Sequence, residues 1–202
     1  MDRRKYTFRI AIWIFLTFLF LYIPITRGHF ISSDEVAMYK VTESIWETGS
    51  LTVKAIPHAF IGKNGNYYTK LNVGQSVAAL PLYGIGRALN NLTENNKENI
   101  WINIFEGPLL GQEDFMWGGD IRIFFVNLFH CFTTAMLCSV FFLFSVRMGF
   151  SHRYALLATV LLGLTTYIAP FSTGFYQHSS EALFLLSTFY FLYKDSQYPH
   201  WK

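Results

Sequence analysis

Residues 8–25 read FRIAIWIFLTFLFLYIPI, an apolar run with a single charge near its start. A helix that crosses a bilayer needs about 20 such residues, because each adds about 1.5 Å and the hydrocarbon core is about 30 Å thick. The run is flanked by basic residues, namely Arg3, Arg4, Lys5 and Arg9. A signal peptide shares these features, but no small-x-small cleavage motif follows, so we expect the run to stay as a membrane anchor.

The composition of the whole chain also indicates a membrane protein. Of its 202 residues, 52% are hydrophobic and only 14% are charged, and the apolar residues are clustered. The net charge of +3 is small and dispersed, so it gives no sign of nucleic-acid binding. Cys131 and Cys138 lie seven residues apart within one apolar run, which predicts packing on one helix face rather than a disulfide.

Further apolar segments predict three more membrane spans, at residues 121–146, 154–173 and 175–193. The basic N-terminus and the arginines of the link after the second span, Arg147 and Arg153, should be cytoplasmic by the positive-inside rule. The C-terminus is then cytoplasmic too. We therefore expect one mainly α, polytopic membrane domain over the whole chain, with about four transmembrane helices.

Residues 27–120 become a long extracytoplasmic segment in this topology. One part of it, residues 73–89, is apolar but short and is broken by Pro81, Gly84 and Gly86. These features favour an interfacial or re-entrant helix. The alternative, that residues 73–89 span the membrane, would move Arg147 and Arg153 outside and stays open on the sequence alone.

The extracytoplasmic segment shows local signals for a helix and a hairpin. Ser32 and Glu35 fit a capping box, which predicts a helix over residues 32–46 that ends at Gly49. Asn64-Gly65 lies between two short segments rich in apolar and aromatic residues, a strong signal for a β-hairpin.

Three further segments of this region have weaker patterns. Residues 51–56 alternate as a strand does. Residues 90–98 are polar and predict a loop, and the scattered aromatic residues of 101–117 predict a stretch that lies at the membrane interface.

The carboxylate pair Asp34-Glu35 follows soon after the first apolar run and opens the predicted helix. Carboxylates are costly to hold near lipid, so this position points to chemistry on a polar substrate at the membrane surface. The structural alternative is that both charges favour the positive end of the helix dipole. Glu35 also fits the capping position, so we expect it to act mainly as a helix cap.

Several stretches together carry a resemblance to a known family. GNYYTKLNVGQS at 65–76 leads to LPLYG at 80–84, and GLTT at 163–166 is followed by FYQHSSE at 175–181. With the basic-flanked first run and the acidic pair, these stretches resemble the GT-C membrane glycosyltransferases. The most similar in pattern are the protein O-mannosyltransferases, the aminoarabinose transferases of lipid A and the bacterial Rgt-type enzymes.

The resemblance implies a polyprenyl-phosphate sugar as donor, an acceptor hydroxyl of a lipid, glycan or protein on the outer face, and inversion at the sugar carbon. It implies Asp34 as general base with Glu35 beside it. It implies no certain cofactor, and a divalent metal is possible without being indicated. Such enzymes have more spans, so we expect a truncated chain or a partner chain that supplies them.

Four residues are candidates for substrate binding. Lys70 could neutralise a phosphate, and the neighbouring Tyr68 could stack on a sugar; the alternative is that both lie at the headgroup level. His178 and Glu181 share a helix face, and Glu181 falls at the apolar end of the fourth span. Structural pairing of Glu181, for instance with Arg122, is the alternative. No second such pair exists to complete a metal site.

Two other functional classes remain open. The first is a non-catalytic membrane fragment, or a subunit that needs a partner to complete a site. The second and weaker one is a small transporter, which would place polar groups at the bilayer midplane between repeats. The sequence does not name the sugar or the acceptor.

Overall fold

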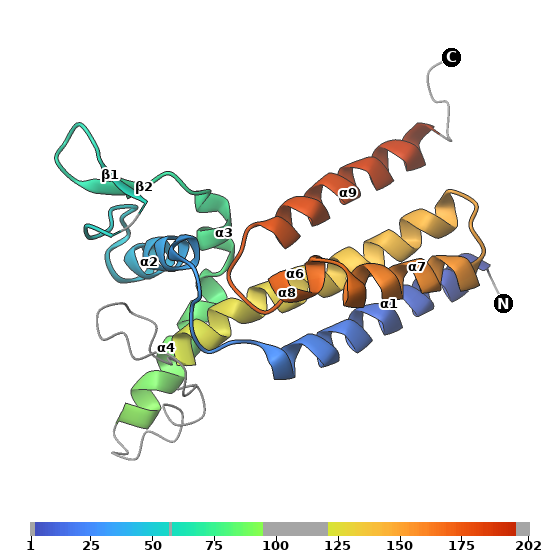
Figure 1. Ribbon diagram of the computed structural model, residues 1–202, viewed down its shortest axis with the longest axis horizontal. Helices are drawn as coiled ribbons and strands as arrows, with labels where there is room; N and C mark the ends of the chain where they lie inside the picture. Colours follow the sequence, from blue (N-terminus) through green and yellow to red (C-terminus); the bar gives the residue numbers. More distant parts are fainter. Residues whose placement is uncertain (1–2, 57, 95–120, 197–202) are drawn as a thin grey trace. The chain divides into compact units, whose positions relative to one another are not determined.

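The computed structural model describes residues 3–56, 58–94 and 121–196, and this part of the chain is mainly helical (Figure 1). It divides into two compact units. Unit 1 consists of residues 1–25, 130–172 and 178–202, and unit 2 consists of residues 26–129 and 173–177. The predictions for residues 95–98 and 101–117 fall outside the described residues.

Unit 1 is built from helices. They are α1 (Arg3–Tyr22) with the 3-10 turn η1 (Ile23–Ile25), the C-terminal part of α6 (Ile121–Arg147), α7 (His152–Thr165), α8 (Ile168–Phe171) and α9 (His178–Ser196). Among the described helices, two are long and apolar enough to cross a membrane: 4–25, of 22 residues, and 121–147, of 27 residues. These two match the first two predicted spans.

The third predicted span, residues 154–173, is interrupted in the structure. Helix α7 has only 14 residues, a rise of about 21 Å, less than the hydrocarbon thickness. Thr166 is extended at its C-terminal end. Pro170 gives a physical reason, because it has no N–H to donate to the carbonyl of Thr166 and its ring would clash with that carbonyl in a continuous helix.

The fourth predicted span begins later than expected. Helix α9 starts at His178 rather than at Phe175, because residues 173–177 belong to unit 2. It has 19 residues and carries Glu181, Lys194 and Asp195, and it is not among the described helices apolar enough to count as a span by composition.

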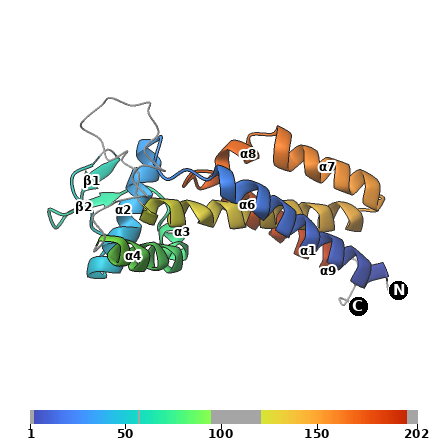
Figure 2. The ribbon, with the colours of Figure 1, turned by 90° about the horizontal axis from the view of Figure 1, so that it is seen from below.

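Side chains that bond to backbone carbonyls connect the helices of unit 1. The Tyr22 hydroxyl on α1 donates to the Gly163 carbonyl on α7 at 2.7 Å. Ser139 on α6 donates to the Ala11 carbonyl at 2.8 Å, and Figure 2 shows α1 running along α6. Cys131 and Cys138 are buried free thiols, which confirms the prediction against a disulfide.

Unit 2 contains α2 (Ser33–Thr48), the strands β1 (Ala59–Ile61) and β2 (Tyr67–Thr69), α3 (Val73–Ala78), α4 (Leu80–Glu94) and the start of α6. Its core gathers apolar side chains from α2, α4, α6, residues 173–177, the segment before α2 and the turn between α3 and α4, namely Phe30, Val36, Met38, Tyr39, Ala79, Tyr83, Ile123, Val126 and Phe175. Burial of this cluster removes apolar surface from water, which favours the folding of unit 2.

The local predictions for α2 and the hairpin are confirmed. Ser32 is the N-cap of α2 with both hydrogen bonds of a capping box, and Gly49 ends the helix in the left-handed region at φ 67°. Strands β1 and β2 pair in antiparallel register, with Phe60 opposite Tyr68, and Gly65 takes φ 78° in the turn. A positive φ of this kind is what a glycine in a tight turn supplies.

Two local predictions are wrong in part. Residues 51–56 form no strand and contribute only one isolated bridge, between Val53 and Tyr67. Their alternation is not matched by alternating burial, so no apolar face holds them in a ladder. The predicted loop at 90–98 is helical as far as Glu94, since α4 continues to that residue.

The apolar segment 73–89 is divided between α3 and α4, and neither helix is a candidate span. Pro81 lies in the first turn of α4, where its missing N–H leaves no helical bond unmade.

Candidate functional site

The N-terminus of α2 is where the acidic pair lies, and the two carboxylates have different surroundings. The backbone N–H of Glu35 donates to Ser32 Oγ at 3.3 Å. Glu35 Oε2 in turn accepts from the N–H groups of Ser32 at 3.1 Å and Ile31 at 2.7 Å. Helix N-termini leave such N–H groups without helical partners, so the Glu35 carboxylate satisfies two of the donors at this chain entry.

Glu35 also bonds to a distant segment that the sequence did not connect with it. Its Oε1 accepts from the N–H of Phe175 at 3.1 Å, and the side chain is fully buried. Arg27 N–H donates to the Thr173 carbonyl at 3.1 Å, and Gln75 Nε2 donates to the Phe175 carbonyl at 3.3 Å. Residues 173–177 are thereby held to the start of α2 within unit 2.

Burial raises the pKa of the Glu35 carboxyl above its usual range. The N–H donors of Ile31 and Ser32, the positive charge of Arg27 and the N–H of Phe175 act in the opposite direction. A carboxylate that is enclosed and bonded by the backbone has no path to a substrate. These contacts favour the structural role of Glu35 over the catalytic one.

Asp34 is the outward-facing member of the pair. Its side chain is 52% exposed, and its Oδ1 lies 3.5 Å from Nε2 of His58. The same nitrogen lies 2.8 Å from Ser33 Oγ. Asp34 is in the first turn of α2, where the helix dipole stabilises the charged carboxylate. It is therefore an accessible carboxyl group with an imidazole beside it.

Nothing in the sequence pattern marks His58, which lies beside Asp34, as a residue of this site. It has φ 63°, and it is the one non-glycine residue with a positive φ in the described part of the chain. For an L-residue that conformation costs about 1–2 kcal/mol, and such strain is often found at functional positions. Only the fold brings it to Asp34, because 24 positions separate the two in the sequence.

Tyr68 and Lys70 lie on and just after β2, in the same unit as Asp34. The Tyr68 hydroxyl accepts from Asn64 Nδ2 at 2.8 Å, and Lys70 is exposed with its Nζ 6.0 Å from the centre of the Phe60 ring. Strand β2 contacts α2, but neither residue forms a hydrogen bond or ion pair with Asp34 in the described structure.

His178 and Glu181 lie in the first turn of α9, in unit 1. His178 Nδ1 is 3.9 Å from Glu181 Oε2, and the two side chains are 56% and 52% exposed, so the expected shared face is present. Arg122 is the alternative partner predicted for Glu181. In the structure its Nη1 lies 3.7 Å from Oε1 of Glu43 instead. Among the described residues, no three His, Cys, Asp or Glu side chains are placed to hold a metal ion.

Comparison of the chain with protein-family models, curated proteins and solved structures finds no match.

The buried Glu35 predicts a specific pH dependence of stability. The folded protein holds the Glu35 proton more tightly than the unfolded chain, since burial raises the pKa. Its contribution is fully present below the ordinary Glu pKa of about 4.3 and is lost as the pH rises through the raised folded value. The thermal unfolding temperature should show this decline in the wild type and lack it in Glu35→Gln. The same decline in both proteins would assign it to another group.

The contact between Gly174 and Glu35 predicts a steric requirement. A Cβ at Gly174 would overlap Glu35 Oε1, whereas a Cβ at Gly74 meets nothing within 4 Å. Gly174→Ala should destabilise the protein by about 1–3 kcal/mol, the usual range for overpacking, and Gly74→Ala should not. Thermal unfolding in detergent measures both, and equal stability of the two variants would contradict the close contact.

Proposed function

We propose that the chain is a membrane glycosyltransferase that transfers a sugar from a polyprenyl-phosphate donor to an acceptor hydroxyl on the extracytoplasmic face. One observation carries the proposal: Asp34 is half-exposed at the first turn of α2, soon after the membrane-competent α1, while its neighbour Glu35 is enclosed by the fold. The resemblance of the sequence to GT-C enzymes supports the same assignment of Asp34 as general base.

The chemistry needs one proton acceptor at the acceptor hydroxyl. Asp34 takes that proton as the hydroxyl oxygen bonds to the anomeric carbon. The bond from that carbon to the phosphate oxygen breaks, and polyprenyl phosphate leaves with the electron pair on its oxygen. Attack from the face opposite the leaving group inverts the sugar carbon. Such general-base assistance contributes about 10²–10⁴-fold to the rate.

In this proposal the chain crosses the membrane four times, and the division of the chain into units 1 and 2 supports that topology. The chain enters unit 2 after Ile25, leaves it within α6, returns for residues 173–177 and leaves again at His178. Because Glu35 and Arg27 hold residues 173–177 in unit 2, the proposed topology has the link before α9 on the same side of the membrane as α2 and the hairpin. The α7–α8 segment and α9 then supply the third and fourth crossings.

The positive charges support the orientation. Arg4 at the start of α1, Arg147 at the end of α6 and Lys194 near the end of α9 line one cavity of unit 1. Each of these three helices connects to unit 2 at one end, and the basic residues lie at the opposite end. The positive-inside rule supports a cytoplasmic location for this end and an extracytoplasmic location for α2 and the hairpin.

If Asp34 is the general base, Asp34→Asn should lower the rate of sugar transfer. The amide cannot accept the acceptor proton, so transfer from a polyprenyl-phosphate sugar in membranes should fall about 10²–10⁴-fold. Glu47→Gln is the matched control, because Glu47 is a half-exposed carboxylate on the same helix, paired with Arg87 at 2.8 Å. That control should keep its activity.

Two results would count against the proposal in different ways. Undiminished transfer by Asp34→Asn would remove Asp34 from the mechanism. No transfer by correctly inserted wild-type protein, with or without added membrane partners, would instead favour the alternative of a non-catalytic membrane subunit.

The proposed donor predicts a role for the exposed Lys70. A charged contact with the donor phosphate is worth about 1.5–3 kcal/mol, so Lys70→Met should weaken donor binding at least about tenfold. Lys63→Met is the control, since Lys63 is also exposed and lies in the turn of the same hairpin. Donor titrations of the transfer reaction measure both variants, and equal apparent affinities would refute a phosphate contact at Lys70.

A further inference from the structure

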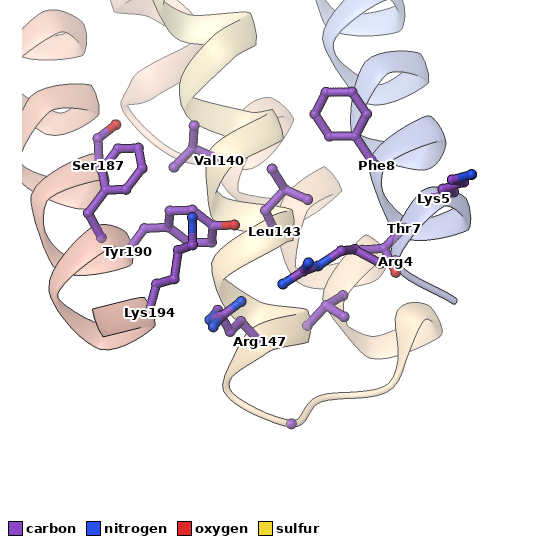
Figure 3. Close-up of a pocket in the computed structure, with 13 residues that line it drawn as sticks. Arg4, Lys5, Thr7, Phe8, Val140, Leu143, Arg147, Ser187, Tyr190 and Lys194 are labelled. Carbon is purple, nitrogen blue, oxygen red and sulfur yellow. The ribbon is translucent and has the colours of Figure 1, made fainter. Parts of the chain in front are cut away.

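Unit 1 contains a cavity of about 1110 Å³ between the ends of α1, α6 and α9 (Figure 3). Its charged lining residues are Arg4, Lys5, Arg147 and Lys194. Among the described residues no Asp or Glu lines it, so its charged lining residues are all basic. Figure 3 shows Arg4 directed toward the space beside α6, whereas Lys5 points away from it.

The Arg147 side chain gives a second, independent observation at this cavity. Its Nε is buried and has no hydrogen-bond partner within the described structure. A buried guanidinium nitrogen without a partner lowers the stability of the fold, because its hydrogen bond to water is lost and no protein acceptor replaces it. An anion in the cavity would satisfy it, and the guanidinium fork suits phosphate oxygens in particular.

The remaining lining makes the cavity amphipathic. Apolar side chains from all three helices contribute to its wall, among them Phe8, Val140, Leu143 and Phe191, and Tyr190 and Ser187 add hydroxyls. Thr7, which also lines it, lies 2.9 Å from His152 Nε2, and this contact joins the start of α1 to the start of α7. A free phosphate would leave most of this volume and the apolar wall unused.

We propose that this cavity binds an anionic membrane phospholipid, with the phosphate headgroup between Arg4, Arg147 and Lys194 and an acyl chain along the apolar wall. The volume exceeds the 300–1,000 Å³ of ordinary ligand pockets, which leaves room for a headgroup and part of a chain. Basic pockets between membrane helices on the cytoplasmic side are recognised sites for anionic headgroups. The proposal requires α1 and α6 to lie in a membrane, but it does not depend on sugar transfer.

The test is lipid binding to the purified protein in detergent, followed by native mass spectrometry. Dioleoylphosphatidylglycerol is titrated against dioleoylphosphatidylcholine, which has the same acyl chains but no net charge. The wild type should retain the anionic lipid at concentrations where it releases the zwitterionic one. Arg147→Gln and Lys194→Gln should each weaken that binding about fivefold, the factor expected for one basic residue at an anionic surface.

The control variant is Arg153→Gln, because Arg153 is an exposed arginine at the start of α7 that does not line the cavity. It should bind the anionic lipid as the wild type does. Lys194 is exposed near the end of α9, so its substitution keeps the test valid if Arg147→Gln fails to fold. Equal retention of both lipids, equal loss in Arg153→Gln, or displacement by inorganic phosphate alone would each overturn the proposal.

Discussion

The Glu35 carboxylate is the contact on which the arrangement of unit 2 depends. Oε2 accepts hydrogen bonds from the N–H groups of Ile31 and Ser32, just before α2. Oε1 accepts one from the N–H of Phe175, 140 residues later in the chain. Removing the carboxylate would leave three backbone donors without this partner, and for the buried Phe175 N–H the cost is about 1–3 kcal/mol. This residue therefore both caps a helix and joins the link before α9 to the segment that follows α1.

That join gives the two acidic neighbours different surroundings. Glu35 is committed to backbone donors and lies out of reach of solvent. Asp34, one position earlier, faces outward beside His58 on a helix end that cannot shift without breaking the Glu35 bonds. The general base proposed at Asp34 needs a fixed position as well as exposure, and the bonds of the adjacent buried Glu35 fix the helix end that carries it. Glu35 therefore fixes the position of the helix end, and Asp34 is the exposed group on that end.

Local signals in the sequence predicted the local structure well. The capping box at Ser32, the turn at Asn64-Gly65 and the long apolar helices all depend on neighbouring residues, so their patterns are readable without a fold. Pro170 is also a local signal, and it indicates an interruption of the helix. The apolar composition of residues 154–173 nevertheless favoured the prediction of one continuous span. The Glu35–Phe175 bond and the approach of His58 to Asp34 were not readable, because each depends on residues that only the tertiary fold brings together.

The central claim is that the Glu35 contacts hold the link before α9 on the same side of the membrane as the hairpin, with the α6–α7 link on the other side. Single cysteines test it directly, in a background carrying Cys131→Ala and Cys138→Ala, with a membrane-impermeant thiol reagent on intact cells. Lys63→Cys and Gln177→Cys should react, and Ser151→Cys should react only after permeabilisation. Reaction of Ser151→Cys in intact cells, or protection of Gln177→Cys while Lys63→Cys reacts, would contradict the account.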